Sequence, residues 1–327
     1  MDWNKQRVLV TGAGGFIGSH LTERLAGLGA TTRALVQYNS RGHRGWLEHS
    51  ATRDQIEFIA GDVRDAGSVR QAMREVDVVF HLAALIAIPY SYQAPNSYVE
   101  TNIIGTLNVL QAAREMGTTR VLHTSTSEVY GTARQVPIPE SHPLQGQSPY
   151  SASKIGADKL AEAFHLSFNV PVVTVRPFNT FGPRQSARAV IPTIITQALA
   201  GQTVKLGKLT PTRDLNFVAN TVDGFLAAAV APAAIGQTIN LGSGREISIG
   251  DLVLLIGKLM DCPMPITQDD QRLRPEKSEV ERLLADNTLA RTLLGWEPQV
   301  TLEAGLTRTI EWLRSNQDKY RPDAYAV

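Results

Sequence analysis

The sequence predicts an α/β fold in which a doubly wound parallel sheet carries a smaller, interleaved α/β lobe. Three observations support this prediction. In the first half, short and continuous apolar runs alternate with segments whose apolar residues recur every three or four positions, a pattern typical of fully buried strands and the helices that cover them. A glycine-rich segment directly follows the first apolar run. A chain of 327 residues is also too long for one small core, so two closely joined lobes are expected.

Six apolar runs in the first half are predicted strands: Arg7–Val10, Thr32–Val36, Ile56–Ala60, Val76–Phe80, Val121–Thr124 and Val172–Val175. The segments between them have helical spacing: Leu21–Leu28, Val69–Arg74, Val99–Glu115 and Ser151–Phe168. After these elements the chain becomes richer in Pro, Gly and Arg. There we predict a helix at Ile191–Ala200 and a short strand at Val204–Leu206. The alternation of strands and helices returns weakly at Asn216–Val230 and Gln237–Leu241.

This pattern divides the chain into two lobes and a tail. Residues 1–178 are predicted to form the sheet domain, with return segments near 214–242. Residues 179–213 and 243–320 are predicted to form the smaller lobe, which would bind the substrate. Residues 321–327 are expected to be a loose tail.

Composition and charge argue against several classes of protein. With 43% hydrophobic and 19% charged residues the chain resembles an ordinary globular protein. Lys and Arg total 32 against 31 for Asp and Glu, so no field of one sign would attract nucleic acid or a membrane surface. The first apolar run is too short for a secretory signal or a membrane span, and Cys262 alone cannot form an intramolecular disulfide. We therefore expect a cytoplasmic protein with no nucleic-acid or membrane partner.

The glycine-rich segment at residues 11–18 is predicted to bind a dinucleotide. Gly12 and Gly15 let the backbone turn tightly and come close to a pyrophosphate. The helix that follows, with Phe16 and Ile17 at its start, offers free N–H groups at its positive end. A lone glycine motif is weak evidence, but its place between a strand and a helix is the context that a Rossmann fold requires.

The sequence leaves the choice between NAD and NADP open. An acidic residue about 20 positions after the glycines usually binds the ribose hydroxyls of NAD. Here the second predicted strand ends in Gln37-Tyr38-Asn39, without a carboxylate. Arg41 and Arg44 follow, and they could hold the 2′-phosphate of NADP or be solvated loop charges. Asp62 and Val63, after the third strand, are placed to border the adenine, although an aspartate there could simply cap a helix.

Tyr150 and Lys154 are the predicted catalytic pair. Four residues apart at the start of a helix, they lie on one face and one turn apart. An ammonium beside a phenol stabilises the phenolate and lowers its pKa from about 10, so the tyrosine can act as a base near neutral pH. A surface pair would show the same spacing. The catalytic interpretation gains weight from Ser125-Thr126-Ser127-Glu128 at the end of the fifth predicted strand, because strand ends carry the ligands in this architecture.

Together these segments resemble the nucleotide-sugar branch of the extended short-chain dehydrogenase/reductases over almost the whole chain. The matching segments are residues 11–18, Gly61-Asp62, His81-Leu82-Ala83-Ala84, Asn102, Ser125–Tyr130, Tyr150–Lys154 and Arg176–Arg184. The resemblance implies a nucleotide-sugar substrate and a nicotinamide cofactor, NAD in most relatives, that stays bound and is regenerated in each turnover. The resemblance implies that Thr126 and Tyr150 bond to the sugar 4-hydroxyl and that Ala83 and Lys154 contact the cofactor. It also implies that Asn179, Arg213 and Arg274 contact the nucleotide diphosphate.

Glu128 favours one reaction among those of the similar enzymes. Sugar 4-epimerases remove and return a hydride and lack a carboxylate at this position. Once C4 is a ketone, a carboxylate can remove the acidic C5 proton, the C6 hydroxyl leaves as water, and hydride return to C6 gives a 4-keto-6-deoxy sugar. Ser127 stands where TDP-glucose dehydratases carry an aspartate, so Glu128 itself would protonate the leaving hydroxyl. The Thr-Ser-Glu triplet also resembles GDP-mannose 4,6-dehydratases and UDP-glucuronate decarboxylases, and a purely structural carboxylate is the alternative.

Four segments narrow the resemblance to the 4,6-dehydratases of legionaminic acid biosynthesis: residues 86–92, 145–150, 183–188 and 274–279. The first is apolar and aromatic, which suits an acetamido sugar better than a glucuronate, although Arg188 could reach the substrate. We therefore predict a 4,6-dehydratase of UDP- or GDP-N-acetylglucosamine. The alternatives are a UDP-glucuronate decarboxylase, then a 4-epimerase and, least favoured, a non-catalytic dinucleotide-binding protein, which would typically lack the Tyr–Lys pair.

Two further expectations concern partners and metals. The helices predicted at residues 99–115 and 151–168 carry broad apolar faces. Because relatives pair these helices across a two-fold axis, the resemblance implies a homodimer; covering the sheet is the alternative. No group of His, Cys and Asp has metal-ligand spacing, so no metal site is predicted. His81 and His123 are interpreted as packing residues.

Overall fold

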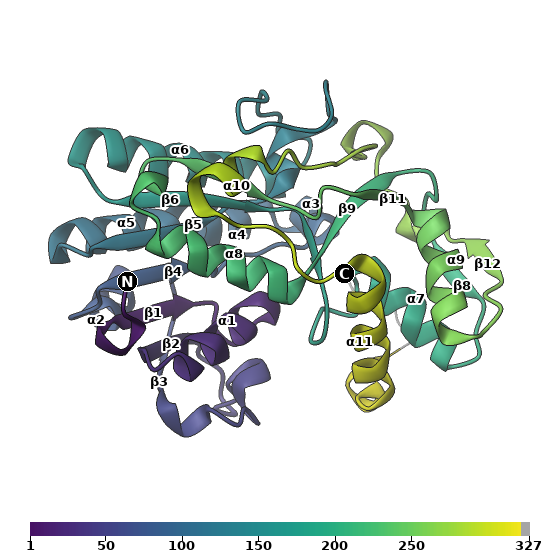
Figure 1. Cartoon of the computed structure of the whole chain (residues 1–327), viewed down its shortest axis with the longest axis horizontal. Coiled ribbons are helices and arrows are strands. Elements are labelled where there is room, and N and C mark those ends of the chain that lie inside the picture. The colour runs from purple at the N-terminus through teal and green to yellow at the C-terminus, as the bar shows by residue number, and fades with distance from the viewer. Residues whose placement is uncertain (322–327) are drawn as a thin grey trace.

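A computed structural model describes residues 1–321 and contains the predicted doubly wound sheet (Figure 1). Seven strands lie in the order β10-β6-β5-β4-β1-β2-β3, and every pair is parallel. Their bounds are β1 Arg7–Thr11, β2 Thr31–Gln37, β3 Ile56–Gly61, β4 Val78–His81, β5 Arg120–Thr124, β6 Val172–Pro177 and β10 Thr238–Leu241. The fold class predicted from the apolar runs is therefore confirmed.

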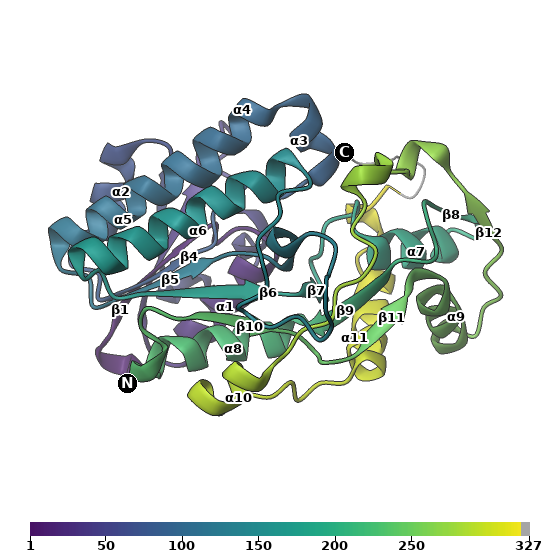
Figure 2. The ribbon, with the colours of Figure 1, turned by 90° about the horizontal axis from the view of Figure 1, so that it is seen from above.

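Helices cover both faces of this sheet, as Figure 2 shows. One face carries α1 (Phe16–Gly27) and α8 (Val218–Val230), and the other carries α2 (Ala66–Met73), α5 (Gly105–Met116) and α6 (Pro149–Phe168). Successive residues of β1 alternate between the two cores: Val8 and Val10 pack in one buried cluster, and Leu9 packs in the other. This two-sided burial explains why the strands read as continuous apolar runs.

The helix predicted over Val99–Glu115 is not uniform. Residues Val99–Ile104 form a π-helical turn, and α5 begins only after it. The wider turn accommodates Asn102, which is buried and binds both backbone polar groups of Leu85 at 2.9 and 3.0 Å and the Ser153 hydroxyl at 2.9 Å. A π-turn of this kind is often found at a functional site. Apolar spacing could not predict it, because its cause is a contact with a distant loop.

The smaller lobe lies at the carboxyl ends of the parallel strands, on the right of Figure 1. It contains a three-stranded sheet in the order β11-β9-β7 and the pair β12-β8. The strand β9 leads directly into α8, which returns beneath the main sheet, so the lobes interleave along the chain. The elements are β7 Asn179–Phe181, α7 Val190–Leu199, β8 Val204–Leu206, β9 Thr212–Phe217, β11 Glu246–Ser248, α9 Ile249–Met260, β12 Ile266–Gln268 and α11 Leu302–Arg314.

Three further helices are short: α3 (Ile88–Gln93) and α4 (Pro95–Tyr98), which lie between β4 and α5, and α10 (Thr288–Leu294). The predicted strand at Val76 begins two residues later, at Val78, because the backbone reverses at Glu75, which has a φ of 59°. Of the predicted tail, residues 322–327 lie outside the described residues. No helix within residues 1–321 is both long and apolar enough to cross a lipid bilayer.

Candidate active site

A large cleft of about 1310 Å³ runs between the two lobes. Its walls come from the glycine-rich segment, from the carboxyl ends of β2, β5 and β6, and from the loops of the smaller lobe. All four predicted catalytic residues line it, as do Gly12, Gly15, Phe16, Ile17 and Ala83 and the five predicted substrate residues, Ser127, Asn179, Arg188, Arg213 and Arg274. Asp62 and Val63 are the two predicted site residues that are not part of the lining.

The glycine-rich segment forms a cradle that side chains would fill. Gly12 has a φ of +68°, and a Cβ there would lie 2.8 Å from the backbone nitrogen of Ala83. A Cβ on Gly18 would overlap the carbonyl oxygen of Gly12. The helix α1 begins at Phe16 without a side-chain cap, so its first N–H groups are left for a ligand. These features fit the pyrophosphate of a nicotinamide dinucleotide.

Thr11 ties this cradle to the next strand of the sheet. Its hydroxyl accepts hydrogen bonds from the backbone nitrogens of Leu82 and Ala83, both at 3.1 Å, and contacts Nδ1 of His81 at 2.8 Å. The other ring nitrogen of His81 lies 3.1 Å from the hydroxyl of Thr106. His81 is thus a buried bridging residue rather than a base facing the cleft.

The end of the cleft beside β2, where the adenosine of a dinucleotide would lie (the adenosine end), contains no carboxylate among the described residues. Gln37, Tyr38, Asn39, His43 and Arg44 line this end, and the Arg44 guanidinium stacks over Phe58 at 4.3 Å. Arg41 does not line it. The side chain of Asp62 is instead paired with Arg64 at 2.6 Å, and Val63 packs in the second buried cluster.

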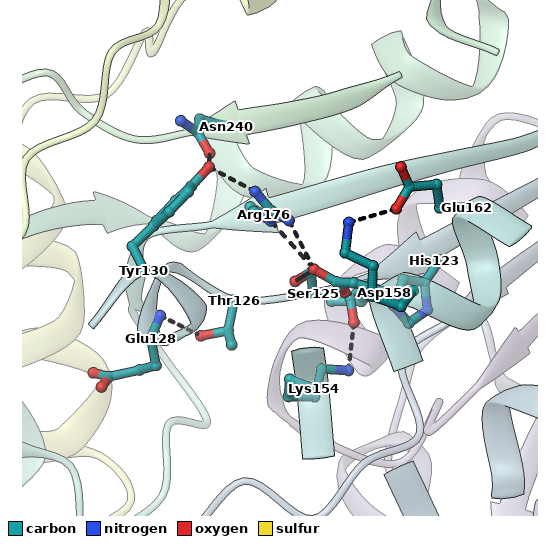
Figure 3. Close-up of polar contacts among 12 residues, drawn as sticks. His123, Ser125, Thr126, Glu128, Tyr130, Lys154, Asp158, Glu162, Arg176 and Asn240 are labelled. Atoms are coloured by element: carbon teal, nitrogen blue, oxygen red, sulfur yellow. Dashed lines mark hydrogen bonds and ion pairs between the residues drawn. The ribbon is translucent and has the colours of Figure 1, made fainter. Parts of the chain in front are cut away.

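The helix α6 positions the predicted catalytic pair. Ser148 caps it reciprocally with Ser151, so that Tyr150 lies in the first turn and Lys154 in the next. Opposite them, Thr126 caps the short 3-10 turn Ser127–Tyr130 that follows β5, and its hydroxyl accepts the backbone N–H of Glu128 at 3.3 Å. Figure 3 shows Thr126, Glu128 and Lys154 around this strand end.

Burial dominates the acid–base properties of this pair. It raises the pKa of Tyr150 above its ordinary value; Glu128 acts in the same direction, whereas Thr126 and Arg188 oppose it. Burial also lowers the pKa of Lys154 to about 8. The ammonium of Lys154 donates to the carbonyl oxygen of Thr124 at 2.6 Å. Lys154 is not among the groups that shift the pKa of this phenol, so the expected lowering of the tyrosine pKa by the lysine stays a prediction.

Two of the predicted nucleotide-binding residues, Arg213 and Arg274, lie on the wall of the cleft that the smaller lobe supplies. Arg213 is buried and donates to Glu279 at 3.1 Å, and Arg274 lies 3.7 Å from the same carboxylate. The side-chain oxygen of Asn179 is buried without a hydrogen-bond partner in the described part of the chain. Two cations and a free amide oxygen suit a diphosphate and a base. Glu279, which holds both arginines, was not among the predicted site residues.

Sequence reasoning also missed a buried charged cluster behind Lys154, formed by Asp158 and Arg176. A carboxylate four residues after the lysine and an arginine inside an apolar strand were its only signals in the sequence. His123 belongs to this cluster through Asp158. Within residues 1–321, no group of three or more His, Cys, Asp or Glu side chains is placed to hold a metal ion.

Known proteins that are similar to this chain include several nucleotide-sugar enzymes. Residues 9–309 match the family model described as GDP-mannose 4,6 dehydratase. The chain is 36% identical to a UDP-glucose 4-epimerase of Mycolicibacterium smegmatis (94% of this chain, 99% of the relative) and 32% identical to UDP-glucuronic acid decarboxylase 1 of Xenopus tropicalis (98% and 75%). The solved structure of DesIV, a dTDP-glucose 4,6-dehydratase from Streptomyces venezuelae with NAD and TYD bound, superposes with a TM-score of 0.87 at 31% identity (97% of this chain, 99% of that chain).

Proposed function

Because this chain belongs to the GDP-mannose 4,6 dehydratase family of nucleotide-sugar enzymes, we propose that it is a nucleotide-sugar 4,6-dehydratase acting on UDP- or GDP-N-acetylglucosamine. One observation carries the proposal: Glu128 lines the same cleft as Tyr150 and lies close enough for its charge to raise the pKa of that phenol. A base for the C5 proton thus stands beside the base for the 4-hydroxyl. Oxidation at C4 alone would need only the base for the 4-hydroxyl.

The residues divide the reaction between them. Tyr150, assisted by Lys154 and Thr126, takes the proton of the sugar 4-hydroxyl. A nicotinamide cofactor bound against the glycine cradle supplies the two-electron acceptor and donor that C4 oxidation and C6 reduction require. Glu128 removes the C5 proton that the ketone has made acidic and passes it to the departing C6 hydroxyl, since Ser127 offers no stronger acid. The proton held by Tyr150 then replaces the one lost from C5, so the net change is loss of one water.

The cofactor is NAD or NADP. Relatives' structures were solved with NAD, as in DesIV. In this chain Gln37 can bond to ribose hydroxyls and Arg44 can pair with a 2′-phosphate, and both line the adenosine end. Mass spectrometry of the dinucleotide released from the purified protein identifies which of the two is bound.

The sugar is inferred from the wall near Tyr150. Ile86, Ala87, Ile88, Pro89 and Tyr92 give this wall an apolar and aromatic character, which suits an acetamido group. One observation favours a second candidate, UDP-glucuronate decarboxylase. Arg188 lies close enough to the catalytic tyrosine to influence its pKa, and a cation there suits a glucuronate carboxylate.

Product mass tests the proposal. We expect the purified enzyme, incubated without added cofactor, to convert UDP- or GDP-N-acetylglucosamine into a product lighter by one water. UDP-glucuronate and UDP-glucose serve as competing substrates. Carbon dioxide lost from UDP-glucuronate alone would identify a decarboxylase. A product of unchanged mass but inverted C4 would identify a 4-epimerase, the activity of the Mycolicibacterium relative. Either result overturns the proposal.

We also propose a homodimer through two helical segments: α6, and α5 together with the π-helical turn that precedes it. These segments run side by side on one face of the molecule (Figure 2). Apolar side chains are exposed there, including Ile104 at 41% and Leu166 at 73%. A second copy of the chain would cover them. We expect a dimer by analytical ultracentrifugation and a monomer for Ile104→Asp, because a buried unpaired charge would oppose association. Leu254→Asp, on the exposed surface of α9, is the control and leaves the mass unchanged. A monomeric native protein would refute the interface.

A further inference from the structure

A cluster of buried charges lies behind Lys154 (Figure 3), and its two charged residues, Asp158 and Arg176, are not part of the cleft lining. Its centre is Asp158, one helical turn further along α6 and only 4% exposed. The carboxylate accepts hydrogen bonds from Ser125 at 2.7 Å, from Nε2 of His123 at 3.0 Å and from the Arg176 guanidinium at 2.9 Å. These three partners come from β5, from its end and from β6, so one carboxylate joins α6 to the strands beneath it.

The cluster continues to the turn that carries Glu128. Arg176 donates to the hydroxyl of Tyr130 at 2.9 Å, and that hydroxyl donates to Asn240 on β10 at 2.7 Å. Tyr130 is the last residue of the 3-10 turn that begins at Ser127, and it is fully buried. The position of the turn is therefore fixed from behind by the same arginine that pairs with Asp158.

Few charged groups act on Lys154 from the elements packed around it. His81 on β4 and His123 on β5 face it, but burial lowers the pKa of both imidazoles, so both are neutral near pH 7. Burial opposes ionisation of Asp158, yet the hydrogen bond from His123 and the charge of Arg176 hold its pKa at about 2. Tyr150 is the remaining titratable neighbour on α6, and it stays protonated at neutral pH. Asp158 is thus the negative charge that supports the ammonium against burial.

A buried ion pair is weak evidence for stability, because apolar residues of similar volume often serve as well. Its place directly behind the catalytic lysine suggests a role in the reaction. We propose that Asp158 is a positioning residue: it keeps Lys154 protonated and, through Ser125 and Arg176, fixes the strand end that presents Thr126 and Glu128 to the substrate. The inference rests on the proposed function only in that Lys154 assists Tyr150.

Asp158→Asn tests the inference, because the amide keeps the shape and removes the charge. A pH titration of the Lys154 side-chain ¹⁵N resonance, assigned with Lys154→Met, reports the ammonium directly and without substrate. In the native protein we expect a midpoint near pH 8. In the variant we expect the midpoint to fall by about one unit, as for the loss of a nearby opposite charge. The pH above which kcat/KM falls should decrease by the same amount, with KM little changed.

Controls separate this electrostatic role from a structural one. Glu162→Gln removes an exposed carboxylate from the same helix, two turns beyond Lys154, and should leave the midpoint in place. If Asp158→Asn does not fold, because it leaves Arg176 buried and unpaired, the double variant with Arg176→Met removes both charges and should show the same shift. An unchanged midpoint in a folded variant overturns the inference. A shifted midpoint in a protein that dehydrates none of the substrates would overturn the proposed function alone.

Discussion

Glu128→Gln is expected to block loss of water while leaving oxidation at C4 partly intact. Glutamine has the shape of glutamate but cannot accept the C5 proton, so elimination should slow by about 10²–10⁴-fold, the usual contribution of a positioned base. The ketone would still form, because Tyr150 and Lys154 are unchanged. We therefore expect the near-ultraviolet absorbance of reduced nicotinamide to build up on mixing with substrate, and exchange of the C5 hydrogen with deuterated solvent to be lost.

A second carboxylate of the same cleft provides the matched control. Glu279 accepts a hydrogen bond from Arg213 at 3.1 Å, on the wall of the cleft that the smaller lobe supplies. Glu279→Gln should therefore raise KM without accumulating reduced nicotinamide. If Glu128→Gln releases water at the native rate, the role assigned to Glu128 is wrong. If the native protein and Glu128→Gln both invert C4 at the same rate, the enzyme is an epimerase and does not need a C5 base.

The features that sequence predicted best are those encoded over short stretches. The glycine cradle, the Tyr150–Lys154 pair and the Thr126–Glu128 turn each lie within eight or fewer consecutive residues, and backbone geometry alone sets their spacing. All of them line one cleft in the structure. The sheet was equally accessible, since strands buried on both faces form continuous apolar runs.

The features that sequence missed depend on contacts between distant residues. Arg213 and Glu279 are 66 residues apart, and nothing in either segment indicates the pairing. Arg64, two residues from Asp62, pairs with its carboxylate, and the adenine contact expected of Asp62 stays a prediction. Burial, a property of the whole fold, is the largest cause of the raised pKa of Tyr150, and no short stretch of sequence shows it. Local patterns identify chemical groups, but the folded surroundings determine their charge states.

Tyr150→Phe should abolish every step, which distinguishes it from the glutamate variant. The ring lies against Tyr98 with centroids 6.2 Å apart, and phenylalanine keeps that packing while losing the proton acceptor. Without an acceptor for the 4-hydroxyl proton the ketone does not form, so C5 never becomes acidic. We expect kcat to fall by about 10²–10⁴-fold, with neither reduced nicotinamide nor exchange at C5.

Tyr98→Phe is the corresponding control, because it removes a second buried hydroxyl near the site. That hydroxyl donates to the carbonyl oxygen of Ala87, and its loss should cost about 1 kcal/mol of stability without stopping the reaction. Thermal unfolding would measure the loss of stability, and product mass would show whether the reaction continues. If Tyr150→Phe still supports exchange at C5, then the ketone forms without the phenol, and another group that lines the cleft must take the 4-hydroxyl proton. The Tyr150 variant would in that case pass the C5 step at which the Glu128 variant stops, whereas the proposed order of reactions requires it to stop earlier.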